Sequence, residues 1–132
     1  MKERNYKPIM ERLAGLLDDV FMEKNCLSGE YQNFGVLAVF AVEQPVMMLE
    51  FRKSIIGNRV QKVLWQLNKL NSRGALGCHS VSISRNEYTD YIFRSEWRLP
   101  YTPSNRRLRA ILNRCLKEAR TGFQQIEKYD DE

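Results

Sequence analysis

Hydrophobic residues recur at helical spacing in three separate stretches of the chain, which predicts three helices. The first follows Asn5 as a candidate cap and Pro8 in its first turn, and its apolar stripe is Ile9, Leu13, Leu16, Leu17, Val20 and Phe21. The second starts at Asn58, and its stripe is Val60, Val63, Leu64, Leu67 and Leu70. The third has Thr102 as cap and Pro103 as first residue, and its stripe is Leu108, Ile111, Leu112, Cys115, Leu116, Ala119 and Phe123.

Four strands are predicted between and after the first two helices. The apolar runs from Phe34 to Val42 and from Val46 to Arg52 are rich in strand-forming residues and form a hairpin around a proline turn. The runs LGCHSVSIS (76–84) and YTDYIFRSEWRL (88–99) form a second hairpin around Arg85-Asn86-Glu87. Residues 26–33, which contain Ser28-Gly29, are predicted to be a loop.

The order of elements is therefore α-β-β-α-β-β-α, which indicates an α+β fold with helices packed mainly on one face of an antiparallel sheet. The last strand alternates an aromatic face with a charged face. The hairpin 34–52, in contrast, is apolar at nearly every position, and such strands are usually covered on both faces. One layer of helices covers one face only, so we expect a second copy of the chain to cover the other.

The run LWQLNKLNSRGALGCHSVSI, followed by a second strand, a proline-containing break and a terminal amphipathic helix, resembles the type III secretion chaperone-like superfamily. The resemblance is to its YbjN-like branch of proposed bacterial sensory transduction regulators. It is carried by Leu67-Asn68 and Asn71, by the strand with Gly77, and by the helix near Thr102. It implies an α-β-β-α-β-β-α domain, often a homodimer, that binds other polypeptides or assists regulation without catalysing a reaction.

Length and composition indicate a single globular domain over residues 1–132, with 43% hydrophobic and 28% charged residues. No run approaches the ~18–20 consecutive apolar residues of a membrane-spanning helix. The charged amino terminus lacks the apolar segment of a secretory signal, so we expect a cytoplasmic protein without membrane contact. The sequence contains three widely spaced cysteines, Cys26, Cys78 and Cys115, and none of them belongs to a CxxC or CxxH pair. This spacing argues against a disulfide framework and against a zinc site.

Positive charge is concentrated in the second half of the chain, within a net charge of +5. Residues 52–120 carry 15 Lys or Arg against 4 Asp or Glu, whereas residues 1–51 carry 5 against 8. Cations in the first turn of a helix oppose its dipole, so the arginines there suggest an anion or acidic partner. The alternative is pairing with Asp18, Asp19, Glu23 or the acidic tail, on the same or a partner subunit. The candidate anion- or partner-binding residues are Arg94, Arg98, Arg106, Arg107, Arg109 and Arg114.

No catalytic, metal-binding or cofactor-binding group can be assembled from the sequence. His79 is the only histidine, and Cys78 beside it points to the opposite face of a strand. No glycine-rich phosphate loop is present, so we expect no cofactor and no enzymatic activity. Aromatic residues at alternating strand positions are often part of a core, and as an alternative they form an interaction surface. The candidate interaction aromatics are Trp65, Trp97, Tyr88 and Tyr91.

Two functions remain open at this point. The first is a non-enzymatic protein-interaction domain that acts as a homodimer and binds a polypeptide partner. The second is a nucleic-acid-binding regulatory protein that uses the basic hairpin and the C-terminal helix, with exposed aromatic rings as stacking platforms. Salt dependence separates the two, because contacts with a phosphate backbone weaken steeply as salt rises.

Overall fold

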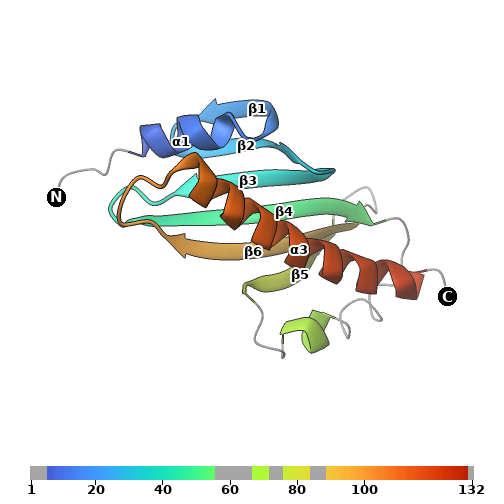
Figure 1. Cartoon of the computed structure of the whole chain (residues 1–132). Helices are drawn as coiled ribbons and strands as arrows, with labels where there is room; N and C mark the ends of the chain where they lie inside the picture. Colours follow the sequence, from blue (N-terminus) through green and yellow to red (C-terminus); the bar gives the residue numbers. More distant parts are fainter. Residues whose placement is uncertain (1–5, 56–66, 72–75, 84–88, 131–132) are drawn as a thin grey trace.

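The computed structural model describes residues 6–55, 67–71, 76–83 and 89–130. Two helices and six strands are defined within them (Figure 1). In chain order they are α1 (Lys7–Ala14), β1 (Asp18–Glu23), β2 (Cys26–Tyr31), β3 (Phe34–Phe40), β4 (Val46–Ile55), β5 (Cys78–Ile83), β6 (Thr89–Arg98) and α3 (Asn105–Asp130). Residues 67–71 form a further short helical stretch.

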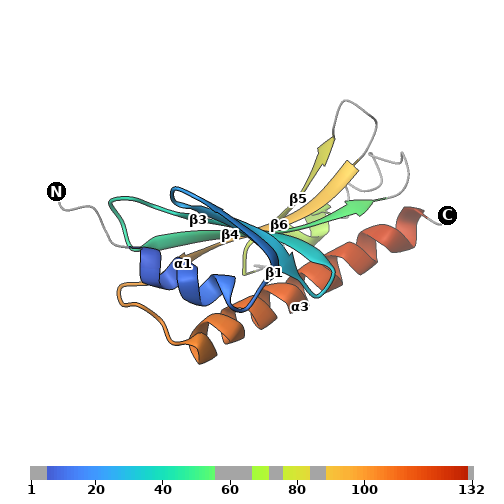
Figure 2. The ribbon, with the colours of Figure 1, turned by 90° about the horizontal axis from the view of Figure 1, so that it is seen from above.

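The six strands form one sheet in the order β1-β2-β3-β4-β6-β5, and all neighbours are antiparallel. Both α1 and α3 lie on the same face of this sheet, and α3 crosses it diagonally (Figures 1 and 2). The predicted α+β class, with helices mainly on one face of an antiparallel sheet, is therefore confirmed. We call the face under the helices the helix face, and the opposite one the open face.

The core lies between the helix face and the two helices. Because side chains alternate along a strand, every second residue of each strand contributes to it. The central strands contribute Phe34, Val36, Ala38, Phe40, Met47, Leu49, Phe51, Tyr91 and Phe93. The predicted stripe of α3 is confirmed, since its seven residues from Leu108 to Phe123 are all buried against the sheet. The helical stretch 67–71 contributes Leu67 to the same core.

The first helix is shorter than the sequence pattern predicts. It ends at Ala14, before Gly15, and Asp18–Glu23 forms the edge strand β1 instead of further helical turns. Glycine lowers helix propensity, and β-branched or aromatic residues such as Val20 and Phe21 fit a strand as well as a helix. Phe21 is 65% exposed, so it does not belong to a buried helical stripe.

The predicted loop 26–33 is also wrong, because Cys26–Tyr31 forms β2 and pairs along its whole length with β3. The turn between them is Gln32-Asn33, and both residues have positive φ, 50° and 70°. Two such residues make the type of turn whose twist matches a hairpin. Gly29 within β2 is required by a close approach of β1: a Cβ there would lie 2.9 Å from the carbonyl oxygen of Asp18.

The last helix starts two residues later than predicted. Its cap is Ser104, whose Oγ accepts a hydrogen bond of 3.2 Å from the backbone N–H of Arg107. Thr102 and Pro103 belong to the preceding connection, where the Pro103 carbonyl accepts a hydrogen bond of 2.7 Å from Arg12 Nη1.

Several predicted features lie outside the described residues: the caps Asn5 and Asn58, most of the second helix, and the turn Arg85-Asn86-Glu87. Within the described ranges, no helix combines the length and the apolar character needed to cross a membrane.

Candidate interaction surface on the open face

The open face is organised in rows that run across the sheet from strand to strand. Residues paired in neighbouring antiparallel strands project on the same face, so the register defines each row. The central row is Phe21, Ser28, Leu37, Glu50, Arg94 and Cys78, one residue from each of the six strands. A second row, on one side of it, is Glu23, Cys26, Val39, Met48 and Glu96. A third, on the other side, is Glu30, Gly35, Arg52, Ile92 and Ser80.

A carboxylate lies at the centre of this face. Glu50 is only 4% exposed although it lies on the face opposite α1 and α3, the two helices defined in the described residues. Arg94 Nε donates a hydrogen bond of 2.9 Å to Glu50 Oε1, and Arg94 Nη2 forms an ion pair with the same oxygen. Arg52 Nη2 lies 3.7 Å from Glu50 Oε2, and Arg52 Nη1 lies 3.7 Å from Asp90. The two guanidinium groups thus compensate the charge of a carboxylate that would be costly to bury alone.

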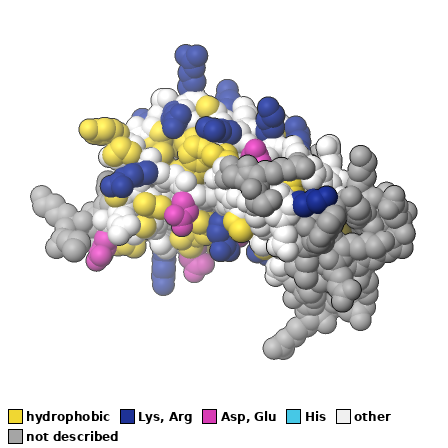
Figure 3. Space-filling view, turned by 90° about the horizontal axis from the view of Figure 1, so that it is seen from below, with side chains coloured by type: hydrophobic (Ala, Val, Ile, Leu, Met, Phe, Trp, Pro, Cys, Tyr) yellow, Lys and Arg dark blue, Asp and Glu magenta, His cyan; other side chains and the backbone are white. Residues whose placement is uncertain are grey.

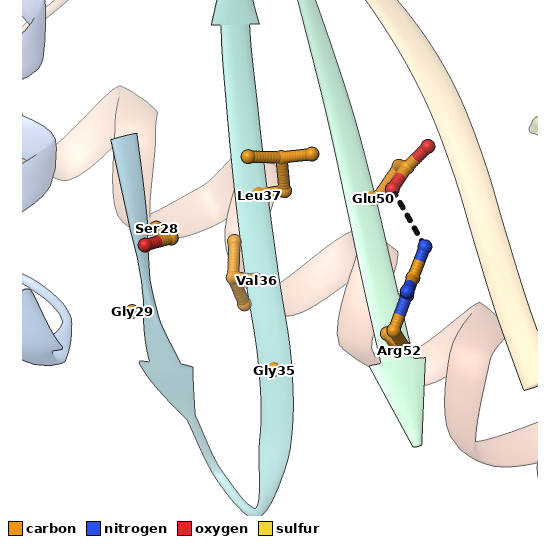
Figure 4. A pocket seen from close by; sticks show the side chains of 7 residues that line it. All are labelled: Ser28, Gly29, Gly35, Val36, Leu37, Glu50 and Arg52. Carbon is orange, nitrogen blue, oxygen red and sulfur yellow. Dashed lines mark ion pairs between the residues drawn. The ribbon is translucent and has the colours of Figure 1, made fainter. Parts of the chain in front are cut away.

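Apolar side chains flank the carboxylate. Leu37, Val39 and Met48 are only half-buried on this face, whereas the residues next to them in sequence are buried under the helices. A cavity of about 290 Å³ opens beside Leu37, Glu50 and Arg52, where Gly35 has no side chain on the open face (Figure 4). The open face therefore combines uncovered apolar surface with a fixed pattern of charges.

The predicted anion-binding arginines fall into two groups. Arg94 and Arg98 lie on the open face, and Arg94 is committed to Glu50. The other four, Arg106, Arg107, Arg109 and Arg114, are exposed on α3. Among the described residues they form no ion pair, so the predicted pairing with Asp18, Asp19 or Glu23 is not present there. Figure 3 shows Lys and Arg side chains (dark blue) around apolar side chains (yellow), with few Asp or Glu between them.

Of the predicted interaction aromatics, the structure describes Tyr91 and Trp97. Tyr91 is fully buried on the helix face, so its ring cannot be part of an interaction surface. Trp97 is half-buried against the core, and its Nε1 donates a hydrogen bond of 2.9 Å to Ser95 Oγ. Trp65 and Tyr88 lie outside the described residues. Among the residues whose exposure the structure describes, the most exposed aromatic ring is that of Tyr101, at 84%, just before α3.

His79 is enclosed in the core beside Tyr91. Its Nδ1 lies 2.5 Å from the Tyr91 hydroxyl, and its Nε2 lies 3.9 Å from a carboxylate oxygen of Glu118 on α3. Burial lowers the pKa of His79, and the charge of Glu118 opposes this with a smaller effect. Burial likewise raises the pKa of Tyr91 above its usual range. His79 is 2% exposed, and its imidazole lies beside the rings of Tyr91 and Phe93 on the helix face, with Glu118 approaching from α3.

Asn71 covers the outer edge of the sheet at β5. Its Oδ1 accepts a hydrogen bond of 2.8 Å from the His79 backbone N–H, and its Nδ2 donates one of 2.9 Å to the His79 carbonyl. Both backbone groups face away from β6, because His79 and Phe93 are a pair without hydrogen bonds to each other. The side chain of Asn71 therefore takes the place of a further strand at this position.

Two groups of residues were not singled out from the sequence. The first is Glu50. Its position inside the apolar run VMMLEFR is the signal that could have identified it, because a charged side chain in such a run usually has a fixed partner. The second is Lys53 with Arg120, on the helix face. The described residues contain no cluster of three His, Cys, Asp or Glu side chains suited to a metal ion.

Solved structures with the same fold are known. The chain is similar to YbjN from E. coli, a candidate transcription regulator, with a TM-score of 0.67 and 6% identity over 95% of this chain and 90% of that one. It is also similar to an uncharacterized protein from Methanothermobacter thermautotrophicus, with a TM-score of 0.60 and 12% identity over 95% of this chain and 98% of that one. No protein-family model and no curated protein sequence matches the chain. The chain thus has a YbjN-like α+β fold, which confirms the resemblance found in the sequence.

Proposed function

We propose that the chain is a non-enzymatic protein-interaction domain with a regulatory role in the cytoplasm. In this proposal two copies associate through their open faces, and the dimer binds a polypeptide partner through the basic surface of α3. The similarity to a candidate transcription regulator supports a regulatory role. Three free cysteines, one of them exposed, fit a reducing compartment.

The observation that carries the dimer is the uncovered apolar surface beside Glu50. Leu37, Val39 and Met48 lie side by side on β3 and β4 with no element of the described chain above them. Burying an exposed apolar side chain contributes roughly 1.5–3 kcal/mol when burial is complete, so three half-buried residues per copy offer a substantial gain. Apolar patches of this kind commonly mark interaction sites.

The charges on the open face suit a second copy of the same surface. The face carries carboxylates, at Glu30 and Glu96, and guanidinium groups, at Arg52 and Arg98. In a two-fold symmetric dimer the same patch is present on both sides, so a patch with both signs can pair with its rotated copy. A patch of one sign would repel itself.

The partner surface is proposed on α3, on the other side of the molecule. Arg106, Arg107, Arg109 and Arg114 are exposed there, and guanidinium groups recognise carboxylates with two parallel hydrogen bonds. An acidic polypeptide would match these exposed arginines.

A nucleic acid is the second candidate partner. It is favoured by the same exposed arginines together with Tyr101, whose ring could stack on an unpaired base. The two partners differ in salt dependence. Binding of an acidic peptide through a few charge pairs weakens moderately with salt, whereas neutralising many phosphates makes binding fall steeply.

The dimer surface is tested by placing a charge in the apolar patch. We expect Val39→Lys to shift the protein from dimer to monomer in sedimentation velocity at micromolar concentration. Ala110→Lys is the matched control, because it adds the same charge at an exposed position of α3. A dimer that tolerates Val39→Lys, with unchanged circular dichroism, would exclude the open face as the interface.

A further inference from the structure

A lysine lies partly inside the core on the helix face. Lys53 follows the buried Phe51 by two residues on β4, so it projects toward the helices with Tyr91 as its neighbour on β6. Its ammonium nitrogen lies 4.7 Å from the ring centroid of Phe123 and 5.2 Å from that of Phe34. Two aromatic faces stabilise a cation, but they do not neutralise it. Among the described side chains, which on α3 end at Ile126, Lys53 forms no ion pair.

A second cation and several amide groups surround the same place. Lys53 lines a cavity of about 200 Å³ between the β2–β3 turn and α3, and Arg120 is on its helix side. Arg120 likewise has no carboxylate partner among the residues that the structure describes. Three carboxamides complete the polar lining: Gln32, Asn33 and Gln124. The rings of Phe34 and Phe123 form the apolar part.

The local backbone keeps this arrangement in place. Gln32 and Asn33 form the tight turn between β2 and β3, with positive φ at both residues, so the turn has little freedom to move away. Phe34 and Phe123 contact each other edge to face, with ring centroids 6.2 Å apart, and join β3 to α3. The cavity is therefore formed by rigid elements from two sides.

The chemistry of the lining matches an oxyanion. A lysine supplies a compact charge with three donors, an arginine supplies a planar fork, and carboxamides supply further N–H donors. Among the residues whose side chains the structure describes, no carboxylate lines the cavity to repel an anion. At about 200 Å³ the cavity is smaller than the ~300–1,000 Å³ of pockets for drug-sized ligands, so it fits one compact group.

We propose that Lys53 and Arg120 form a binding site for the phosphate group of a small phosphorylated molecule. The phosphate lies between the two cations, the carboxamides donate to its oxygens, and the remainder of the ligand extends toward solvent. This inference goes beyond the proposed interaction surfaces and does not depend on them, because the cavity lies on the opposite side of β3 and β4 from the open face.

The test uses inorganic phosphate and phenyl phosphate as probes on the full chain. We expect saturable binding in ¹H–¹⁵N NMR titrations, with a dissociation constant of about 1 mM or tighter and the largest shifts at residues 32–34, 53 and 120–124. Lys53→Met removes the charge and keeps an apolar chain over the rings, and Arg120→Gln removes the fork. Each is expected to weaken binding at least about tenfold, which corresponds to roughly 1.4 kcal/mol.

Lys117→Gln is the matched control, since it removes one exposed cation from the same helix outside the cavity. It is expected to leave the affinity unchanged. Equal weakening by Lys117→Gln, or the same shifts with chloride at matched ionic strength, would reduce the effect to general charge attraction and overturn the proposal. Tighter binding of phenyl phosphate than of inorganic phosphate would identify an organic phosphate as the ligand, whereas absence of saturable binding of both would exclude the site.

Discussion

Arg94 and Glu50 are paired across β6 and β4 at the centre of the open face, and the carboxylate is almost inaccessible to solvent although the arginine is exposed. Because Glu50 has little contact with water, the neighbouring arginines must compensate its negative charge. Its two oxygens are approached by Arg94, its neighbour in the central row, and by Arg52, its neighbour along β4 in the third row. An unpaired carboxylate at this place would lose most of its contact with water without compensation.

Arg94→Met is therefore expected to lower the free energy of unfolding by about 1–3 kcal/mol, because it leaves a buried acceptor without its main donor. Urea denaturation followed by circular dichroism measures the change. The double variant Arg94→Met with Glu50→Gln should recover part of the loss, as the charge is removed together with its partner. Additive effects of the two substitutions would contradict a direct interaction.

His79 gives the fold a pH dependence of a definite sign. Burial lowers its pKa in the folded chain, so the unfolded chain binds a proton more readily. The free energy of unfolding should therefore fall as the pH drops below about 6.5, the usual value for histidine. The groups that face the ring are Tyr91, through its hydroxyl, and Glu118, whose charge opposes the shift only in part.

This prediction can be measured directly because the chain has one histidine. A single imidazole signal is expected in the ¹H NMR spectrum, with a titration midpoint below about 6.5. The stability difference between the wild-type chain and His79→Gln should change over the same pH range. A midpoint above that value would show that attraction to Glu118 exceeds the cost of burial.

Gly122 on α3 packs closely against Tyr91 and His79. A Cβ on this residue of α3 would lie 2.3 Å from the Tyr91 hydroxyl and 2.6 Å from His79 Nδ1. Gly122→Ala should therefore destabilise the chain by about 1–3 kcal/mol through overpacking, against a gain of about 1 kcal/mol in helix propensity. Thr121→Ala, at the exposed neighbouring position, is the control. A Gly122→Ala variant with a higher melting temperature would contradict the packing.

Asn71 is expected to protect one position of the edge strand β5. Asn71→Ala removes both hydrogen bonds to the His79 backbone, at a cost of about 1 kcal/mol each. The amide of His79 should then exchange with deuterium faster, while the amides of β3 keep their protection. Asn68→Ala, one turn earlier on the exposed side, should leave His79 unchanged.

Much of the fold follows from the sequence because periodicity reports burial. The stripe of α3, the hairpin of β3 and β4, and the alternation in β6 depend on which residues meet the core, and all three are found. The hairpin of β1 and β2 was missed for a physical reason. Val20 and Phe21 continue a helical spacing by coincidence, and the strand pairing that decides their conformation involves residues that resemble a loop, such as Ser28 and Gly29.

The candidate sites are harder to predict from the sequence, because they depend on which residues of distant strands and helices lie opposite each other. Glu50 meets Arg94 over 44 residues of chain, and nothing in the local pattern of either residue specifies the pairing. Lys53 and Arg120 come together only because α3 crosses the sheet beside the β2–β3 turn. The sequence pattern predicts a loop over residues 26–33, so it does not indicate this turn. The concentration of arginine on α3, in contrast, was visible in the sequence.

The most direct test of the account is the solution mass of the wild-type chain by light scattering at low and moderate salt. The account predicts a dimer, twice the chain mass of 15.6 kDa, at both salt concentrations and without co-purified nucleic acid. A monomer at micromolar concentration would contradict the open face as a self-association surface. A monomer that carries nucleic acid at low salt and releases it as salt rises would favour the nucleic-acid-binding function instead.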